Sequence, residues 1–323
     1  STAIWLAKDH KISALKKYNT DGSLGLFYAN ATESLGWRQA SDEWKLMGLA
    51  PYGEVGKIDL SQFHPHFSNG KLLKPHSYSK SYMLKEGRSN HMHSPEASDI
   101  KNHSKNISRE DFAAQVQYVA EQEALKLIIP QVEKNQVKNL AVAGGCFMNI
   151  KLNGLLRDHK KVQNFWVYPD AGDAGLSIGA ALHAHYENSE TSHPNEIYKL
   201  DHLYYGPQYN NEQIKKELLA KGIKFEKHEN IAEVTAELLA QNLTIGWFQG
   251  RMEIGPRALG NRSILMSPIN PNNKNIINAK IKYRENFRPF CPSILEEEVN
   301  HWIKNPKEEK FMASAYRVLE EQA

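Results

Sequence analysis

Two consecutive strand–glycine-loop–helix units constrain the fold of this chain more than any other feature. The apolar runs at residues 138–143 and 164–168 each lead into a glycine-containing loop and then into a helical pattern. The loops are Gly144-Gly145 and residues 170–175, and the helical patterns cover residues 147–157 and 176–186. Short strands that alternate with helices are typical of layered α/β proteins. We therefore predict an α/β fold.

The segments before these units predict a mixture of strands and helices. Residues 1–37 favour a strand, a turn at Thr20–Ser23, a second strand and the start of a helix. A short helix is expected at Asp42–Met47. A longer one is expected at Ser108–Ile129, because Ser108 is a typical N-cap residue and apolar residues follow it at helical spacing. Residues 54–108 are polar and rich in histidine, so we expect little regular structure there.

The composition of residues 188–202 is that of a linker. We therefore place a domain boundary near residue 200 and two domains at residues 1–200 and 201–323. The second domain is predicted to contain both helices and strands. We expect helices at residues 210–221, 231–242 and 272–280, and strands at residues 223–227, 244–248, 263–267 and 311–319.

Basic residues gather in one stretch of the second domain. Residues 251–288 hold eight lysines and arginines against Glu253 and Glu285, a net charge of +6, whereas the whole chain carries +3. Arginine side chains bind phosphate through two N–H groups, and loop glycines let backbone N–H groups join them. The stretch therefore predicts an anion site. A nucleic-acid backbone is the competing anion, because Tyr283, Phe287 and Phe290 could stack on bases.

Three features of the first domain each have a ligand-binding and a purely structural interpretation. Gly144-Gly145, with Asn149 and Asn153 on one face of the following helix, fits either a nucleotide cradle or a tight turn with two solvated amides. Asp173 fits a metal ligand or, by its local pattern, an N-cap. Lys45 fits a phosphate contact or a solvated helical lysine, and the isolated pattern favours the latter.

Histidines crowd residues 64–103, but they lack the spacing of a metal site. No H-x₃-H pair on a helix face and no C-x-x-C motif accompanies them. We therefore predict a solvated polar loop. The residues concerned are His64, His66, His76, His91, His93 and His103.

Several protein classes are excluded by composition. No apolar run reaches the roughly 18 residues that span a bilayer, and the first residues do not resemble a signal peptide. The two cysteines, Cys146 and Cys291, do not make a disulfide framework, so we predict reduced and mostly buried thiols in a cytoplasmic protein.

Five of these segments together resemble one family. The chain resembles the NodU/CmcH-type O-carbamoyltransferases, which tailor antibiotics and nodulation factors. The matching segments are EWKLMGLAPYG (43–53), AGGCFMNIKLN (143–153), DAGLSIGAA (173–181), GRMEIGPRALGNRS (250–263) and IKYRENFRPFCPS (281–293).

The resemblance implies two catalytic modules. Residues 1–200 would be the C-terminal half of an actin-like (ribonuclease-H-like) ATPase domain, and residues 201–323 part of a YrdC-like α/β domain. In such enzymes the YrdC-like module condenses carbamoyl phosphate with ATP to carbamoyl-adenylate and pyrophosphate. The actin-like module then passes the carbamoyl group to an acceptor hydroxyl near a bound iron.

The resemblance also implies the ligands and the partners. ATP and carbamoyl phosphate would be substrates, with a small molecule that carries a hydroxyl group as acceptor. The metal would be a divalent ion, Fe²⁺, with Mg²⁺ as a further candidate. Neither a membrane nor nucleic acid is an expected partner, and a homo-oligomer is left open.

Roles are carried over by position in the matching segments. Arg257, Lys282 and Arg288 would be the catalytic residues that hold carbamoyl phosphate or its adenylate, with Asn261, Arg262 and Arg284 as substrate-binding neighbours. Asp173 would ligate the metal. The residues around the nucleotide would be Lys45, Gly48, Gly144, Gly145, Asn149 and Asn153.

The chain departs from the family at both ends. The family's first phosphate loop and the H-x₃-H pair that shares the metal have no counterpart, and the chain stops inside the YrdC-like module. We therefore expect a fragment. The alternatives are a tRNA threonylcarbamoylation enzyme, which shares both module types, and a non-catalytic nucleotide-binding protein.

Overall fold

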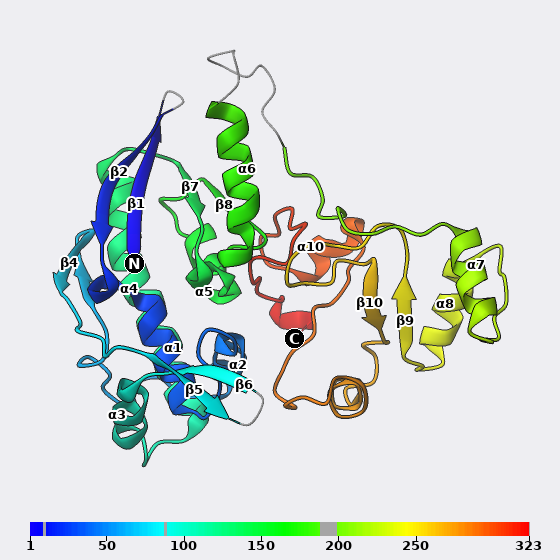
Figure 1. Cartoon of the computed structure of the whole chain (residues 1–323), viewed down its shortest axis with the longest axis horizontal. Coiled ribbons are helices and arrows are strands. Elements are labelled where there is room, and N and C mark those ends of the chain that lie inside the picture. Colours follow the sequence, from blue (N-terminus) through cyan, green and yellow to red (C-terminus); the bar gives the residue numbers. More distant parts are fainter. Residues whose placement is uncertain (9–10, 87–88, 188–198, 323) are drawn as a thin grey trace. The chain divides into compact units, whose positions relative to one another are not determined.

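The computed structural model describes residues 1–8, 11–86, 89–187 and 199–322, and its elements are shown in Figure 1. The chain falls into two compact units. The first unit is Ser1–Asn195 with Ala313–Ala315, and the second unit is Glu196–Met312 with Tyr316–Ala323. Most of the predicted linker, residues 188–198, lies outside the described residues. Helices and small two-stranded sheets are mixed in the part of the chain that the structure describes.

Helix α4, Arg109–Lys134, is the central element of the first unit. The hydroxyl of Ser108 accepts the N–H of Asp111 at 3.0 Å, which confirms the predicted N-cap. Pro130 lies inside the helix without ending it, so α4 extends beyond the predicted Ile129. Helices α1 (Leu24–Ser34) and α2 (Glu43–Leu49) pack against it, and α3 (Pro95–His103) packs against α1. The core between them contains Phe27, Leu46, Ile100, Phe112 and Val116, all nearly inaccessible to water.

Near the start of the chain, β1 (Thr2–Lys8) and β2 (Lys11–Tyr18) pair antiparallel. The turn predicted at Thr20–Ser23 is present, but it follows β2 and does not join the two strands, so only its predicted place between them is wrong. Residues Thr20–Gly22 form a 3₁₀ turn after β2. The reason is local, since the hydroxyl of Ser23 accepts the N–H of Leu26 and caps α1.

The expectation of little regular structure at residues 54–108 is also wrong. This region contains α3 and two hairpins, made of β3 (His66–Ser68) with β4 (Lys71–Lys74) and β5 (Tyr82–Glu86) with β6 (Ser89–His93). The strands are three to five residues long, too short for a periodic pattern to reveal. Phe67 of β3 is buried, and β3 contacts α4.

The two strand–glycine-loop–helix units are present as predicted. Strands β7 (Asn139–Val142) and β8 (Asn164–Val167) pair in parallel, with Asn139 opposite Asn164. Helix α5 (Ile150–Arg157) connects them, and α6 (Leu176–Glu187) follows β8. Short 3₁₀ turns at Gly145–Met148 and Asp173–Gly175 open the two helices. Leu152 and Leu156 of α5 pack with Ala124 and Ile129 of α4, which places this β–α–β unit against the helical core.

The second unit is built of short elements. It contains α7 (Asn211–Ala220), α8 (Ile231–Ala240), the antiparallel pair β9 (Ile245–Phe248) and β10 (Arg262–Leu265), α9 (Asn273–Ile276) and α10 (Val299–Trp302). The helix predicted at 272–280 continues from α9 as a π-helical turn, Ile277–Lys282.

The strands predicted at residues 223–227 and 311–319 are absent from the described structure, so both predictions are wrong. Ile223 and Phe225 are exposed and pair with no strand among the described residues. In the second region, Val318 makes a single bridge with Ile303, and Ala313–Ala315 belongs to the first unit. Apolar composition alone therefore did not reveal whether a strand partner exists.

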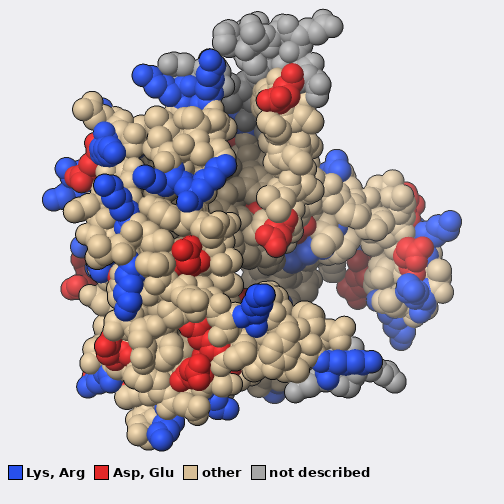
Figure 2. All heavy atoms as spheres, turned by 60° about the vertical axis from the view of Figure 1, so that its left-hand side comes forward, with Lys and Arg blue, Asp and Glu red and all other residues tan. Residues whose placement is uncertain are grey.

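The surface carries a second group of basic residues besides 251–288. Figure 2 shows Lys and Arg side chains gathered on the upper part of one face. Strands β1 and β2 contribute four lysines and no acidic residue: Lys8, Lys11, Lys16 and Lys17. None of the helices in the described ranges has both the length and the apolar character that a bilayer crossing needs.

Both cysteines are exposed free thiols, so the prediction that they are mostly buried is wrong. Cys146 lies in the 3₁₀ turn before α5, and Cys291 lies in an irregular segment of the second unit. Neither occupies a face of an element that packs into the core.

Candidate functional site

The arginine-rich loop between β9 and β10 is organised around one buried carboxylate. Glu253 is only 5% exposed, and its Oε1 accepts the backbone N–H groups of Leu259, Asn261 and Arg262 at 2.8, 2.7 and 3.2 Å. The side chain of Asn261 in turn donates to the carbonyl of Arg251 at 2.7 Å. From the sequence, Glu253 was interpreted only as a countercharge to the basic residues. The feature that could have indicated its structural role is that it is the one acidic residue of a loop rich in arginine and glycine.

The pKa of Glu253 reflects this arrangement. Burial by itself would raise the pKa of the carboxyl group, but the backbone N–H bonds outweigh it and hold the pKa below its usual range. The folded state therefore favours the carboxylate. Its contribution to stability is fully present above the ordinary glutamate pKa, near 4.3, and is lost as the pH falls through the lowered pKa.

We expect Glu253→Gln to lower the free energy of unfolding by about 2 kcal/mol at neutral pH, because the amide is a weaker acceptor for three N–H groups. The difference from the wild type should begin to shrink as the pH falls below the ordinary glutamate pKa, near 4.3, and should disappear only below the lowered pKa of Glu253. Denaturant unfolding at pH 7 and at pH 3.5 measures both. Equal stability of the two proteins at pH 7 would contradict this role. Glu296→Gln, on an exposed 3₁₀ turn, is the control.

The arginines of the loop differ in what their guanidinium groups contact. Arg251 donates to the carbonyls of Gly206 and Tyr205, and Arg262 donates to the carbonyl of Gln249 at 2.6 Å while lying 3.6 Å above the ring of Phe248. Carbonyl oxygens carry no net charge, so these hydrogen bonds do not supply a countercharge for the two guanidinium groups. The predicted contact of Arg262 with substrate stays a prediction. Some N–H groups of its guanidinium group already donate to backbone carbonyls.

The second basic segment follows the π-helical turn. Arg284 donates to Asn278 Oδ1 at 2.6 Å and lies 4.4 Å from the ring of Phe290. Arg288 Nη1 is 3.8 Å from Glu285 Oε2, and its side chain is partly exposed. Lys282, the last residue of the turn, is exposed. The predicted roles of Arg257, Lys282 and Arg288 remain predictions, and Arg257 is likewise partly exposed.

In the first unit the two glycine loops lie side by side. The N–H of Gly144 donates to the carbonyl of Ala171 at 2.7 Å, which ties the loop after β7 to the loop after β8. Gly144 has a φ of 107°, a conformation that favours glycine. A Cβ at Gly144 or Gly145 would meet no atom within 4 Å, so open space lies over both glycines. The structure leaves room for a ligand at this elbow.

The two asparagines beside this elbow are bonded within the protein, so the interpretation as solvated amides is wrong. Asn149 caps α5, because its Oδ1 accepts the N–H of Leu152 at 3.1 Å, and its Nδ2 donates to Gln117 at 2.9 Å. Asn153 is fully buried, and its Nδ2 donates to the carbonyls of Phe147 and Ala313 at 2.7 Å each. Their predicted contacts with a nucleotide stay predictions.

Lys45 is largely covered, so the interpretation as a solvated helical lysine is wrong. Its Nζ lies 3.2 Å from Asp42 and 5.3 Å from the ring centre of Trp44, and its side chain is 19% exposed. The apolar neighbours of the short helix α2 turn it inward. Gly48 lies within the same helix.

Asp173 is the first residue of the 3₁₀ turn after β8, whose N-cap is Gly172, so the N-cap interpretation is wrong. Within the described residues, no set of three His, Cys, Asp or Glu ligand atoms includes Asp173. The described part of this chain therefore does not complete a centre for the predicted iron. The metal role of Asp173 stays a prediction.

The histidine region is not the solvated loop that the sequence predicted. His64 is buried, His76 bonds to Glu96, and His93 bonds to Glu33. Each of these acids lies on a helix that packs in the core of the first unit, which a spacing rule within residues 64–103 could not reveal.

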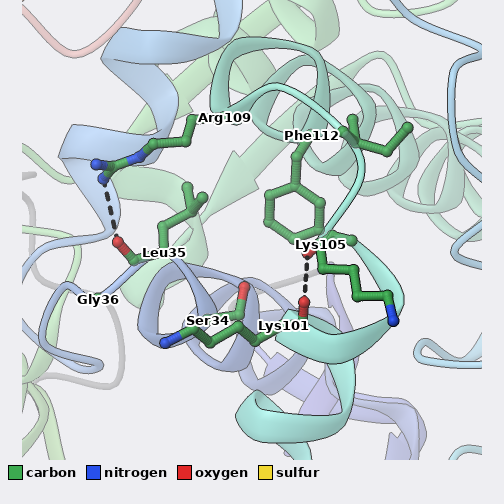
Figure 3. A pocket seen from close by; sticks show the side chains of 9 residues that line it. Ser34, Leu35, Gly36, Lys101, Lys105, Arg109 and Phe112 are labelled. Atoms are coloured by element: carbon green, nitrogen blue, oxygen red, sulfur yellow. Dashed lines mark hydrogen bonds between the residues drawn. The ribbon is translucent and has the colours of Figure 1, made fainter.

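A pocket that the sequence analysis missed lies between α1, α3 and α4 (Figure 3). It encloses about 260 Å³, and three basic residues line it: Lys101, Lys105 and Arg109. Arg109 donates to the carbonyl of Leu35 at 3.1 Å and stacks over Trp37. Its basic lining comes from α3, from α4 and from the turn between them, which contain Lys101, Arg109 and Lys105 respectively.

Comparisons with known proteins agree on one family. A family model described as the carbamoyltransferase N-terminus matches residues 1–182, and one described as the carbamoyltransferase C-terminus matches residues 236–323. Nodulation protein NolNO of Sinorhizobium fredii is 36% identical over 92% of this chain and 42% of that protein. Nodulation protein NolO of Bradyrhizobium diazoefficiens is 35% identical over 96% of this chain and 56% of that protein.

Uncharacterized relatives match over similar lengths. One from Synechocystis is 35% identical over 99% of this chain and 54% of that protein. The chain therefore spans about half the length of the curated relatives it matches. The two family matches do not support the prediction that the chain is a fragment of its two modules.

Proposed function

This chain belongs to the carbamoyltransferase family, and from that premise we propose that it transfers a carbamoyl group to a hydroxyl group of a small-molecule acceptor. The observation that carries the proposal is where the two matched regions lie. The N-terminal match, residues 1–182, includes both glycine loops, and the C-terminal match, residues 236–323, includes the whole arginine-rich loop. Two phosphate-compatible elements are thus found in the two matched regions.

The proposed donor chemistry uses carbamoyl phosphate and ATP in the second unit. Water first attacks the phosphorus of carbamoyl phosphate, the bond between that phosphorus and the carbamoyl oxygen breaks, and carbamate and inorganic phosphate form. An oxygen of the carbamate then forms a bond to the α-phosphorus of ATP, the bond from that phosphorus to the β-phosphate breaks, and pyrophosphate leaves with carbamoyl-adenylate as the product. Negative charge develops on phosphoryl oxygens throughout this step, and positioned cations stabilise it. We assign that role to Arg257, Lys282 and Arg288. Their neighbours Asn261, Arg262 and Arg284 position the substrate, and the bonds around Glu253 keep the loop in shape.

The proposed transfer takes place in the first unit. The acceptor hydroxyl attacks the carbonyl carbon of carbamoyl-adenylate, the hydroxyl proton leaves to solvent, and AMP is released. The open space over Gly144 and Gly145 would admit a phosphate of the nucleotide. Lys45, Gly48, Asn149 and Asn153 would complete its surroundings. The actin-like and YrdC-like character of the two units is part of this proposal.

A carbamoyl-transfer assay on the full-length protein tests the proposal. Carbamoyl phosphate labelled in its carbonyl carbon is incubated with ATP, with and without hydroxyl acceptors, and products are separated by chromatography. Labelled carbamoyl-adenylate without an acceptor, and labelled carbamate ester with one, are the expected results. ATP binding without either product would instead favour a non-catalytic nucleotide-binding protein.

A further inference from the structure

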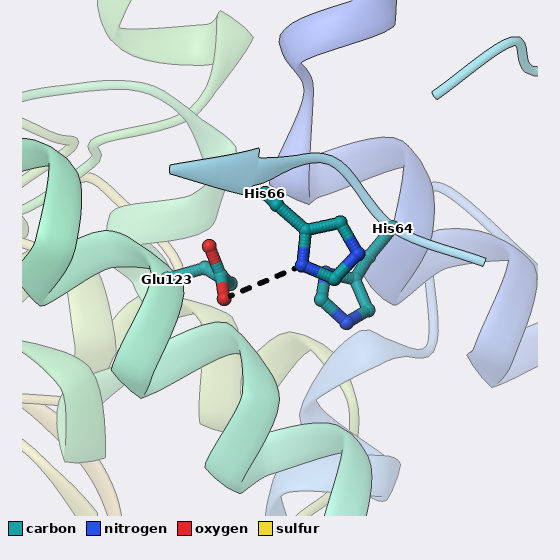
Figure 4. A group of neighbouring side chains, drawn as sticks. All are labelled: His64, His66 and Glu123. Carbon is teal, nitrogen blue, oxygen red and sulfur yellow. Dashed lines mark ion pairs between the residues drawn. The ribbon is translucent and has the colours of Figure 1, made fainter. Parts of the chain in front are cut away.

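Three potential ligand atoms from distant segments meet beside α4 (Figure 4). His64 precedes β3, His66 begins it, and Glu123 lies on α4. The rings of His64 and His66 lie next to each other, with 4.4 Å between their centroids. One ligand atom from each of the three residues lies within 4.8 Å of the other two. We propose that His64, His66 and Glu123 bind a divalent transition-metal ion, with Zn²⁺ as the best match.

The hydrogen bonds of the two imidazoles leave the facing nitrogens free to bind a metal. His64 Nδ1 lies 2.9 Å from the carbonyl oxygen of Pro65, and His66 Nε2 lies 2.7 Å from that of Ser61. A carbonyl oxygen only accepts, so each of these nitrogens carries the ring proton. His64 Nε2 and His66 Nδ1 therefore keep their lone pairs in the neutral ring. Metal-binding histidines are oriented in this way by a second, outer partner.

Glu123 supplies the third ligand atom, a carboxylate oxygen, from a fixed position. It is 3% exposed, and its Oε2 accepts the N–H of Phe67 at 2.7 Å. Its Oε1 lies 4.0 Å from His66 Nδ1 and 2.8 Å from Lys126 Nζ. The side chain of Lys126 is 52% exposed, so its ammonium group can move into water when a metal ion takes its place. Lys126 and a metal ion thus compete for one oxygen.

The donor set decides which ion is expected. Two imidazole nitrogens and one carboxylate oxygen match three-ligand Zn²⁺ sites, which keep a fourth position for water, whereas Ca²⁺ and Mg²⁺ prefer oxygen alone. The ion would link β3 and the residues just before it to α4. None of the three residues lies in the segments that carry the proposed reaction, so the site is independent of the proposed function.

Metal titration of the chelator-treated full-length protein tests the site. With Zn²⁺ alone, calorimetry should show one equivalent bound at His64, His66 and Glu123, and the melting temperature should rise. Co²⁺ in place of Zn²⁺ should give the visible absorption of a four-coordinate site. We expect His66→Gln and Glu123→Gln each to weaken binding about a hundredfold.

The controls separate this site from others. His103→Gln, whose ring contacts Asp59 in the same region, should bind Zn²⁺ like the wild type. Asp173→Asn should also leave this equivalent in place, whatever its effect on carbamoyl transfer. Zn²⁺ binding that is absent, or equally strong in His66→Gln and Glu123→Gln, would overturn the proposal. The melting temperatures of both variants without metal check that they fold.

Discussion

Arg257→Ala and Arg288→Ala should each lower the rate of carbamoyl-adenylate formation at least a hundredfold. Each substitution removes a cation from loops that place positive charge where phosphoryl oxygens become more negative, and loss of one such group typically costs about 10²–10³ in rate. Both side chains are partly exposed, so their removal leaves no buried charge without a partner and the fold should survive.

Pyrophosphate exchange into ATP that depends on carbamoyl phosphate measures this step directly. Lys280→Ala removes the same charge from an exposed position of the π-helical turn and should keep nearly full exchange. Turnover that is unchanged in both arginine variants would refute the assignment. A loss of the same size in Lys280→Ala would mean that total charge, rather than position, is what the reaction needs.

Asn153→Ala should lower the free energy of unfolding by about 3 kcal/mol. Its Nδ2 bonds two carbonyls, those of Phe147 and Ala313, at a position without any access to water. Each buried carbonyl left without its partner costs about 1–3 kcal/mol. Residues Ala313–Ala315 should exchange their amide hydrogens faster as well, because this bond helps to hold them on the first unit.

Urea unfolding and hydrogen exchange measure these two effects. Asn139→Ala is the matched control. The side chain of Asn139 is exposed, and among the described residues its side-chain hydrogen bond is with the side chain of Asn164. It should change stability by no more than about 0.5 kcal/mol. An Asn153→Ala protein of wild-type stability with weakened ATP binding would instead favour the role that the resemblance implies.

The two asparagines show why residue type and spacing were insufficient at the glycine elbow. The sequence correctly grouped Asn149 and Asn153 with Gly144 and Gly145, and the structure does bring these residues together. The partners of the amides come from elsewhere, namely Gln117 on α4 and Ala313 near the end of the chain. A pattern within one helix contains no information about such distant partners.

The arginine-rich loop lies where it was predicted, but the hydrogen bonds that hold it together were not predicted. Its bounds, its glycines and its flanking strand β9 were predicted, because turns and short apolar runs are local signals. The role of Glu253 was not, since three backbone N–H groups converge on it only after the loop closes. From its charge alone, Glu253 was interpreted only as a countercharge to the basic residues.

Local signals were enough to predict the capped helix α4, the β7–α5–β8–α6 units, and the positions of the glycine and arginine loops. Long-range packing settled which short strands pair, which amides and carboxylates bond inside the protein, and that His64 and His66 meet Glu123. The two groups differ in the sequence distance over which their interactions act. Capping and periodic burial act over a few residues, whereas hydrogen bonds and metal ligands join groups that the chain separates by tens of residues.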